Sequence, residues 1–488
     1  MGTFNGNTQG GRFSAHRAQA GGRGAAAWKQ IGFSLLLLLD LFLLYTIAMQ
    51  LTHKQMAFET TKTVNLTLLA LFILGALGLA WMVIRVHAWK RLLCLALIAC
   101  ICYLTVAFSQ LPLIKEYREI WIKTAMATMR HQGLATFYFP ASTVDEVWQQ
   151  YIDAVGAQEN IESEDPTNLG QNVHEAEDWT EPTGNWSIEE EKFDKLTDEQ
   201  KTFYSMFYEL DVDSAEAYFK DHPAALQSGY LHVLVNEASL NSNGTSIVTK
   251  LGEKVLAIDA ENQILILEVR CDGARGVLAV AKRPDWLHLF PSATLPNHGQ
   301  TVGTIASKHN GILAMTGSGF IDEGGVGNGG QIAGWAMCGG QTYGSHFGWG
   351  YKRLEMRENN WFYIKKATDK VDSTTRDSME FQPAMIVNGE GVDIGYWTDK
   401  NPRACIGQSK RGEILMLCVE GRVAGGSWGC SLNYCKETLL QHDCQTAMNC
   451  DGGTTAIMWY RGEPIMRCSN SSIPQGRYLP NAWVYVGK

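Results

Sequence analysis

Three long apolar runs near the start of the chain constrain its fold more than any other feature. They occupy residues 31–51, 64–84 and 92–111, and each is close to the about 20 apolar residues that a helix needs to cross a bilayer. A cleaved signal peptide is an alternative for the first run, but two more runs follow directly and Ala48-Met49-Gln50 is a poor cleavage site. The sequence therefore predicts three transmembrane helices within residues 31–111 and a lipid bilayer as a partner.

The basic residues around these runs predict their orientation. Most lie before the first run or between the second and third, and few lie between the first and second: Arg12, Arg17, Arg23, Lys29, Arg85, Lys90 and Arg91 against Lys54 and Lys62. The positive-inside rule then makes residues 1–30 a cytoplasmic tail. Three crossings leave everything after residue 111 outside, so we expect a multi-pass protein of the cell membrane with an extracytoplasmic C-terminal domain.

One acid, Asp40, lies inside the first run, where a charge is expensive. No basic residue lies within the three runs to pair with it. We therefore expect Asp40 to pack between helices or to face water rather than to form part of a proton path.

Residues 112–230 form an acidic region that reads as helical. Between Asp145 and Glu199 this region carries seventeen acids against two lysines, Lys192 and Lys195. Residues 196–201 have the capping residues and charges of a solvated helix. The expected role of the region is a charged helical spacer between the membrane and an outer domain.

Residues 231–488 have the composition of a separate, sheet-rich domain. Short apolar runs alternate with turns and predict strands, and two windows predict helices. We therefore expect an α+β fold, a sheet-rich mixed α/β extracytoplasmic domain preceded by three transmembrane helices and the acidic helical spacer. The expected strands are residues 255–260, 264–270, 276–281, 414–419 and 482–486, and the expected helices are residues 301–308 and 435–442.

Charge and cysteine usage limit the classes of protein that fit. A net charge of −9 argues against a nucleic-acid partner, which would require a basic patch. Nine of the twelve cysteines lie in the predicted exterior part, where disulfides are permitted, and an odd number leaves at least one free or paired between chains. No CxxC pair and no cluster with zinc spacing occurs, so we predict no metal site and expect most of these cysteines to be small buried residues.

Five polar stretches lie near the ends of expected strands and are candidates for a functional site. Their glycines permit positive φ angles and close approach of a ligand to the backbone. Each stretch is weak evidence alone, because an arginine at a strand end is usually a surface ion pair. The stretches are residues 316–330, 401–408, 420–422, 448–462 and 476–482.

In order and spacing these stretches resemble the phosphodiester glycosidase domain. This domain family includes the uncovering enzyme, an N-acetylglucosamine-1-phosphodiester α-N-acetylglucosaminidase. A weaker match, through Ser318-Gly319-Phe320 and residues 325–330, extends the resemblance back to about residue 252. The closest motif matches are Asn401-Pro402-Arg403 with Gly407, Glu420-Gly421-Arg422, Asn449-Cys450-Asp451-Gly452-Gly453-Thr454-Thr455, and Arg477 with Pro480-Asn481-Ala482.

Three positions depart from the pattern of this family. The family usually has Asp where Glu420 stands, Gly-Ser or Ser-Ser where Thr454 and Thr455 stand, and an asparagine near Thr316. The first two departures keep the chemical type of the residue. The third departure, the missing asparagine near Thr316, leaves the residues of the N-terminal half of the site unassigned. The whole arrangement is also similar to membrane-anchored bacterial proteins described as exopolysaccharide-biosynthesis relatives of the uncovering enzyme.

The resemblance implies a membrane-anchored extracytoplasmic hydrolase of sugar-1-phosphodiesters in exopolysaccharide or cell-wall glycopolymer metabolism. Asp451 and Glu420 would act on water or at the anomeric carbon, as paired carboxylates do in glycosidases. Arg403 and Arg422 would clamp the phosphate, which can replace a strong general acid because a phosphomonoester is a good leaving group.

Substrate contacts would come from a glycine nest that binds anions and from neighbouring hydroxyl, amide and guanidinium groups. The residues implied are Gly452, Gly453, Thr454, Thr455, Arg477, Asn481, Asn449, Ser318 and Asn328. The partner would be a sugar phosphodiester or a phosphate-containing glycopolymer. No cofactor is certain and a divalent cation stays open, as do the sugar, the aglycone, the bond that breaks and the oligomeric state.

Other interpretations of the same residues remain. Asp451-Gly452-Gly453 is also a common hairpin turn, in which the acid is only a cap. The arginines would equally serve a non-catalytic module that binds phosphate-linked glycopolymer and acts in assembly of the cell envelope. A third alternative is a transferase that moves the glycan to another acceptor.

Overall fold

The chain forms two compact units in the computed structural model, Met1–Val147 and Trp148–Lys488. The structure describes residues 11–53, 55–58, 60–128, 131–166, 186–322, 325–347, 350–423 and 426–488. Part of the predicted acidic spacer, residues 167–185, and Lys54 of the first loop lie outside the described residues.

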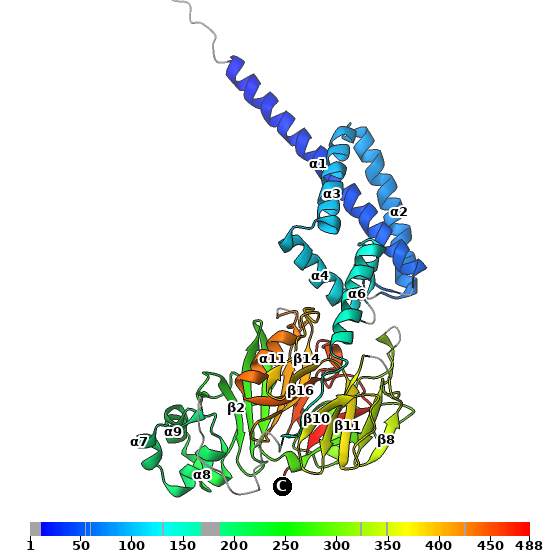
Figure 1. Ribbon diagram of the computed structural model, residues 1–488. Coiled ribbons are helices and arrows are strands. Elements are labelled where there is room, and N and C mark those ends of the chain that lie inside the picture. Colours follow the sequence, from blue (N-terminus) through cyan, green and yellow to red (C-terminus); the bar gives the residue numbers. More distant parts are fainter. Residues whose placement is uncertain are drawn as a thin grey trace, which may run out of the picture. The chain divides into compact units, whose positions relative to one another are not determined.

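The first unit is helical and contains the three apolar runs (Figure 1). Three of its segments, Ala26–Thr52, Lys62–Arg85 and Trp89–Phe108, are long and apolar enough to cross a membrane. The third was expected to continue to residue 111, but it ends at Phe108 because Ser109 is extended and Pro112 begins a new helix. The helices are α1 (Gly11–Thr52), α2 (Lys62–Arg85), α3 (Trp89–Phe108), α4 (Pro112–Met126), α5 (Gly133–Thr136) and α6 (Ala141–Ala157), whose end belongs to the second unit.

Helices α1 and α2 pack against each other at small residues. Gly75 of α2 faces Asp40 of α1, and a Cβ atom added to Gly75 would lie 2.8 Å from the Oδ1 atom of Asp40. The side chain of Leu37 is buried in the same cluster as Val83 and Ala88. This placement agrees with the expectation that Asp40 takes part in helix packing.

The second unit is a sheet-rich α+β domain, which confirms the predicted fold class. Its largest sheet has nine antiparallel strands in the order β1-β2-β3-β4-β15-β14-β16-β12-β13. The bounds along this order are Leu234–Asn236, Lys254–Asp259, Ile264–Cys271, Ala274–Ala281, Ile414–Val419, Arg403–Ser409, Cys444–Asn449, Ala384–Val387 and Glu390–Gly391.

Two further antiparallel sheets of five strands each complete the domain. One has the order β10-β9-β11-β7-β8, with bounds Phe362–Lys366, Lys352–Arg357, Thr375–Phe381, Trp335–Cys338 and Gln341–Gly344. The other has the order β18-β17-β6-β19-β5, with bounds Glu463–Pro464, Met458–Tyr460, Leu313–Thr316, Asn481–Tyr485 and Leu287–Pro291.

The central strands are buried on both faces, which explains their nearly continuous apolar sequences. Every residue of β14 and of β15 is buried. Helix α11 (Leu432–Gln441) packs against this sheet, as its position over β14 and β16 shows in Figure 1. Residues of all three sheets share one hydrophobic core, in which the ring of Trp483 contacts that of Phe362.

Short helices between residues 190 and 221 add to the same core. They are α7 (Glu190–Asp194), α8 (Asp198–Met206) and α9 (Val212–Asp221), and α10 (Val302–Lys308) follows later. The predicted capping of α8 is present, since the Thr197 side chain accepts from the backbone N–H of Gln200. Phe203, Phe207 and Phe219 are nevertheless fully buried with the strands, so this segment is more than a solvated spacer.

Candidate active site

The register of the large sheet brings three of the predicted motifs to one end. Arg403, the first residue of β14, pairs with Val419, the last residue of β15. Cys405 of β14 pairs with Asn449, the last residue of β16. The start of β14 at Arg403, the end of β15 before Glu420 and the end of β16 before Asp451 therefore lie at the same end of the sheet.

A second sheet contributes its own strand ends to this place. Thr316 ends β6 and is paired with Ala482 near the start of β19. The Thr316 hydroxyl donates to the carbonyl oxygen of Thr455, and the backbone N–H of Asp451 donates to the carbonyl oxygen of Gly317 at 3.2 Å. These two bonds join the loop after β16 to the loop after β6.

Asp451 is the acid at the centre of this junction. Burial raises the pKa of its carboxyl group to about 7, although the Thr455 side chain and the positive charge of Arg477 act in the opposite direction. The neighbouring carboxylate of Asp322 raises it further. An acid with a pKa near neutrality can exchange a proton during a reaction, which is a common property of catalytic carboxyl groups.

The two glycines after Asp451 allow close packing against the start of β14. A Cβ atom on Gly452 would lie 2.9 Å from the carbonyl oxygen of Pro402, and Gly453 has φ +65°, in the left-handed region that favours glycine. The Gly453 N–H donates to the same Pro402 oxygen at 2.9 Å. That N–H is therefore occupied and is not a free donor for an anion.

Among the three predicted arginines, Arg422 has a guanidinium group that is not bound by any described residue. Its side chain is partly buried and makes no hydrogen bond or ion pair to any described residue. A Cβ atom on Gly453 would lie 3.9 Å from its Nη1 atom, so the guanidinium group lies beside the loop of Asp451. Burial and the positive charge of Arg403 lower the pKa of Arg422, while Asp399 opposes this change.

The other two predicted arginines already have acidic partners. Arg403 is buried, and its Nη2 atom donates to Asp399 Oδ2 at 2.9 Å while its Nε atom donates to the Cys430 carbonyl oxygen at 3.0 Å. Both Nη atoms of Arg477 donate to Asp322, and Nη2 also donates to the Gly327 carbonyl oxygen at 2.8 Å. These arginines are held in fixed positions near Asp451.

Glu420 is held by two arginines. Its Oε1 atom accepts from Arg275 Nη1 at 2.8 Å, and its Oε2 atom accepts from Arg467 Nε at 2.8 Å. The residue is buried and borders a pocket of about 510 Å³ whose lining includes Arg270, Asp272, Arg275 and Arg467 but not Asp451 or Arg477. Both oxygen atoms of the Glu420 carboxylate are thus occupied by arginines.

The remaining predicted substrate contacts mostly bind other parts of the protein. Ser318 and Asn481 are fully buried and hydrogen-bond to each other, with Ser318 N–H donating to Asn481 Oδ1 at 2.8 Å. Asn449 donates to the Gln382 carbonyl oxygen at 2.8 Å. The last three predicted contacts also have protein partners: Thr454 accepts from Ser469, Thr455 donates to Gly452, and Asn328, although exposed, donates to Asn297.

The structure adds residues that the sequence motifs did not single out as site members. Asp322 and Asp399 hold the two paired arginines, and Asp322 was visible in the glycine-rich stretch 316–330 without a sign of its partner. Tyr351 lies near Asp451, whose charge adds to the burial that raises the pKa of this phenol. Nothing in the sequence pointed to Tyr351, which is far from Asp451 along the chain.

Comparisons with known proteins find one matching domain family. Residues 309–486 match the family model of the phosphodiester glycosidase domain. The match begins just before β6 and ends after β19, and it includes Asp451 and all three arginines discussed above. No curated protein sequence matches this chain significantly.

Three solved structures align with parts of the chain. The catalytic domain of a zebrafish N-acetylglucosamine-1-phosphodiester α-N-acetylglucosaminidase, auto-inhibited by its pro-peptide, aligns with 52% of this chain and 87% of its own, at 15% identity and a TM-score of 0.39. A Synechocystis protein aligns with 49% and 65% of the two chains at 13% identity and a TM-score of 0.32. A Burkholderia pseudomallei protein aligns with 43% and 74% at 13% identity and a TM-score of 0.30.

Proposed function

We propose that the chain is a membrane-anchored hydrolase of sugar-1-phosphodiesters that acts outside the cytoplasm. The match to this domain family supports a glycosidase-type hydrolase. Three helices that can cross a membrane support the anchor, and the charges around them favour an exterior C-terminal domain. An N-acetylglucosamine-1-phosphodiester is the substrate type that the family resemblance suggests, and exopolysaccharide or cell-wall glycopolymer is the corresponding natural material.

The observation that carries the proposal is the guanidinium group of Arg422, which makes no ion pair to any described residue and lies beside the loop of an acid with a pKa near 7. A partly buried cation that is not directly paired is costly, and an anionic ligand would lower that cost. A phosphodiester has one negative charge and oxygens that a guanidinium fork binds with two parallel hydrogen bonds. The Arg422 position therefore suits the phosphate, and we propose that Asp451 acts on the adjacent sugar.

In the proposed reaction, water attacks the anomeric carbon of the sugar. The bond between this carbon and the phosphate oxygen breaks, and its electron pair stays on the phosphate, which leaves as a phosphomonoester. Ionised Asp451 takes the proton from the attacking water, and Arg422 stabilises the charge on the leaving phosphate. Free sugar and phosphomonoester are the products.

The fixed arginines position this machinery. Arg477, held by Asp322, sets the charge around Asp451. Arg403 connects Asp399 with the carbonyl oxygen of Cys430 and so fixes the start of β14. Glu420 would position the segment that carries Arg422 and would not contact the substrate.

The test is turnover by the full-length chain in detergent, with N-acetylglucosamine-1-phosphodiesters as substrates. We expect release of free sugar by the wild type and loss of release in Asp451→Asn. Binding without release in the wild type would support the glycopolymer-binding alternative. A glycosylated acceptor in place of free sugar would support the transferase, and a loss of turnover with EDTA would show that activity depends on a divalent cation, either in the reaction or in the fold.

A further inference from the structure

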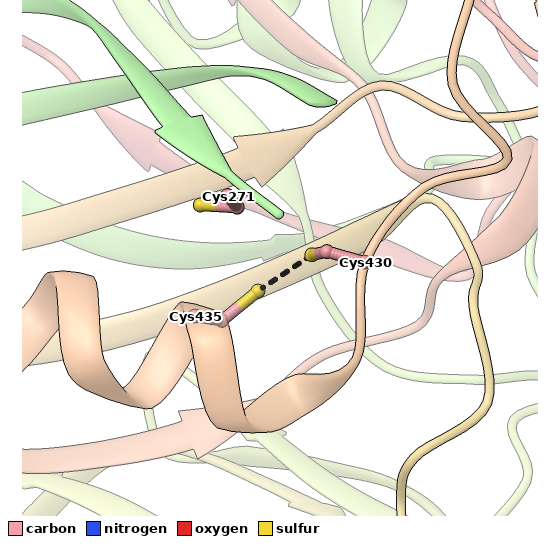
Figure 2. Close-up of side chains that lie close together, drawn as sticks. All are labelled: Cys271, Cys430 and Cys435. Atoms are coloured by element: carbon pink, nitrogen blue, oxygen red, sulfur yellow. Dashed lines mark hydrogen bonds between the residues drawn. The ribbon is translucent and has the colours of Figure 1, made fainter. Parts of the chain in front are cut away.

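Three buried cysteines from distant parts of the sequence meet beside α11. Cys271 ends β3, Cys430 lies just before α11, and Cys435 lies in its first half. Figure 2 shows the sulfur atoms of Cys430 and Cys435 turned toward each other, with Cys271 nearby. The Sγ atoms of Cys430 and Cys435 are 3.5 Å apart, and all three lie within 4.8 Å of one another.

We propose that Cys271, Cys430 and Cys435 bind one Zn²⁺ ion that fixes α11 and the neighbouring loop to the large sheet. Structural zinc sites use cysteine sulfurs at about 2.3 Å from the metal, which places two sulfurs about 3.8 Å apart at tetrahedral corners. The sulfur separations here fit this arrangement with only small movements. The three thiol side chains are also sealed from solvent, as in a closed structural site.

A fourth buried thiol lies on a neighbouring strand but outside the group of three. Cys405, on β14, is fully buried, and its Sγ atom lies 3.9 Å from Asn449 Oδ1, so it would have to move to reach a metal ion. Four thiolates are a frequent ligand set for structural zinc. Spacing alone could not predict this group, because its members come from β3, from the loop before α11 and from α11, and only Cys430 and Cys435 are near in sequence.

The surroundings suit an anionic metal centre. Three or four thiolates carry more negative charge than Zn²⁺ neutralises. The positively charged Arg403 lies close by, since its Nε–H donates to the Cys430 carbonyl oxygen at 3.0 Å. The hydroxyl of Thr438 lies 3.4 Å from Cys271 Sγ. Polar groups outside the first coordination shell commonly orient metal ligands in this way.

The proposed metal would support the candidate active site without taking part in the reaction. Cys430 also exchanges two backbone hydrogen bonds with Asn401, at 3.1 and 3.2 Å, just before Arg403. A metal held by Cys430 would therefore stabilise both the loop after Arg422 and the start of β14. The competing states are three packed thiols without a metal and a Cys430–Cys435 disulfide. Each of these states predicts a different zinc content or number of free thiols.

The decisive experiment is metal analysis of the full-length chain purified in detergent without chelators. We expect about one zinc per chain, and loss of that zinc in both Cys271→Ala and Cys435→Ala. Cys418→Ala is the matched control, because Cys418 lies fully buried in β15 of the same sheet but outside the cluster. This control should retain the zinc.

Two measurements on the wild type keep the test independent of how the variants fold. Replacement of the metal by Co²⁺ should give the visible absorption of a tetrahedral cobalt–thiolate centre. Thiol titration in denaturant with EDTA should find all twelve cysteines free. The proposal would be overturned by a metal-free protein with twelve free thiols, or by a protein with only ten free thiols, which would indicate a disulfide. It would also be overturned by copper bound in place of zinc, or by zinc retained in both cluster variants.

Discussion

Replacement of Asp451 by asparagine should stabilise the folded protein at alkaline pH while it removes activity. The pKa of Asp451 rises from 3.8 to about 7 on folding because the residue is partly buried and its carboxyl group loses solvation. A raised pKa means that the folded state binds this proton more tightly than the unfolded state does. The wild type therefore loses stability as pH rises from about 4 to 7, and the cost is complete above pH 7.

The size of the effect follows from the same pKa values. Each pKa unit corresponds to about 1.4 kcal/mol, so the ionised carboxylate costs the fold at most roughly 4 kcal/mol above pH 7. Asparagine has nearly the same shape and no charge to bury. Asp451→Asn should therefore be more stable than the wild type at pH 8.5, and the gain should almost vanish near pH 4.

Thermal unfolding of the full-length chain, followed by tryptophan fluorescence at pH 4.5 and 8.5, measures this difference. A gain of 1 kcal/mol corresponds to about 2–4 °C in domains of 150–250 residues, so a rise of several degrees is expected at pH 8.5. Asp221→Asn, at an exposed position at the end of α9, is the control and should show no such rise.

Activity gives the second half of the prediction. Loss of a positioned acid or base costs about 10²–10⁴-fold in rate, so turnover should collapse in the stabilised variant. If Asp451→Asn instead lowers the unfolding temperature at both pH values, the carboxylate is a stabilising cap of a hairpin turn. That result would refute the reasoning from burial.

Three other predictions concern the arginines, Glu420 and the topology. Arg422→Lys keeps the charge but loses the guanidinium fork, so KM should rise about 10–100-fold, as expected for charged hydrogen bonds, with an unchanged unfolding temperature; an unchanged KM would remove Arg422 from the substrate site. Glu420→Gln should destabilise the fold by about 1–3 kcal/mol in denaturant unfolding, because Arg275 and Arg467 lose their shared charge partner while Arg275 keeps Glu268, and a fully stable variant would contradict this role. Protease added to intact cells should remove the C-terminal domain, and its survival until lysis would contradict the proposed orientation.

The parts of the fold that were predictable are those with strong local signals. Residues 414–419 were recognised as a strand because they form a short continuous apolar run, and β15 has the same bounds. Residues 301–308 were expected to form a helix, and α10 spans Val302–Lys308 with Thr301 as its N-cap. Such signals are local, so they do not depend on which strands become neighbours.

The candidate site was only partly predictable for the opposite reason. Residue type and position at strand ends pointed to Asp451 and Arg422. The sequence could not show that Arg275 and Arg467 occupy the carboxylate of Glu420, because these partners come from separate strands and loops. The Cys271 cluster was missed in the same way, since its members meet only through the order of strands in the large sheet.

The central claim is that water attacks the sugar carbon of a sugar-1-phosphodiester, and ¹⁸O-labelled water tests it most directly. The full-length chain is incubated with an N-acetylglucosamine-1-phosphodiester in labelled water, and the products are separated and weighed by mass spectrometry. The proposed mechanism predicts the label in the released sugar and none in the phosphomonoester. Label in the phosphomonoester, or no release of sugar at all, would contradict it.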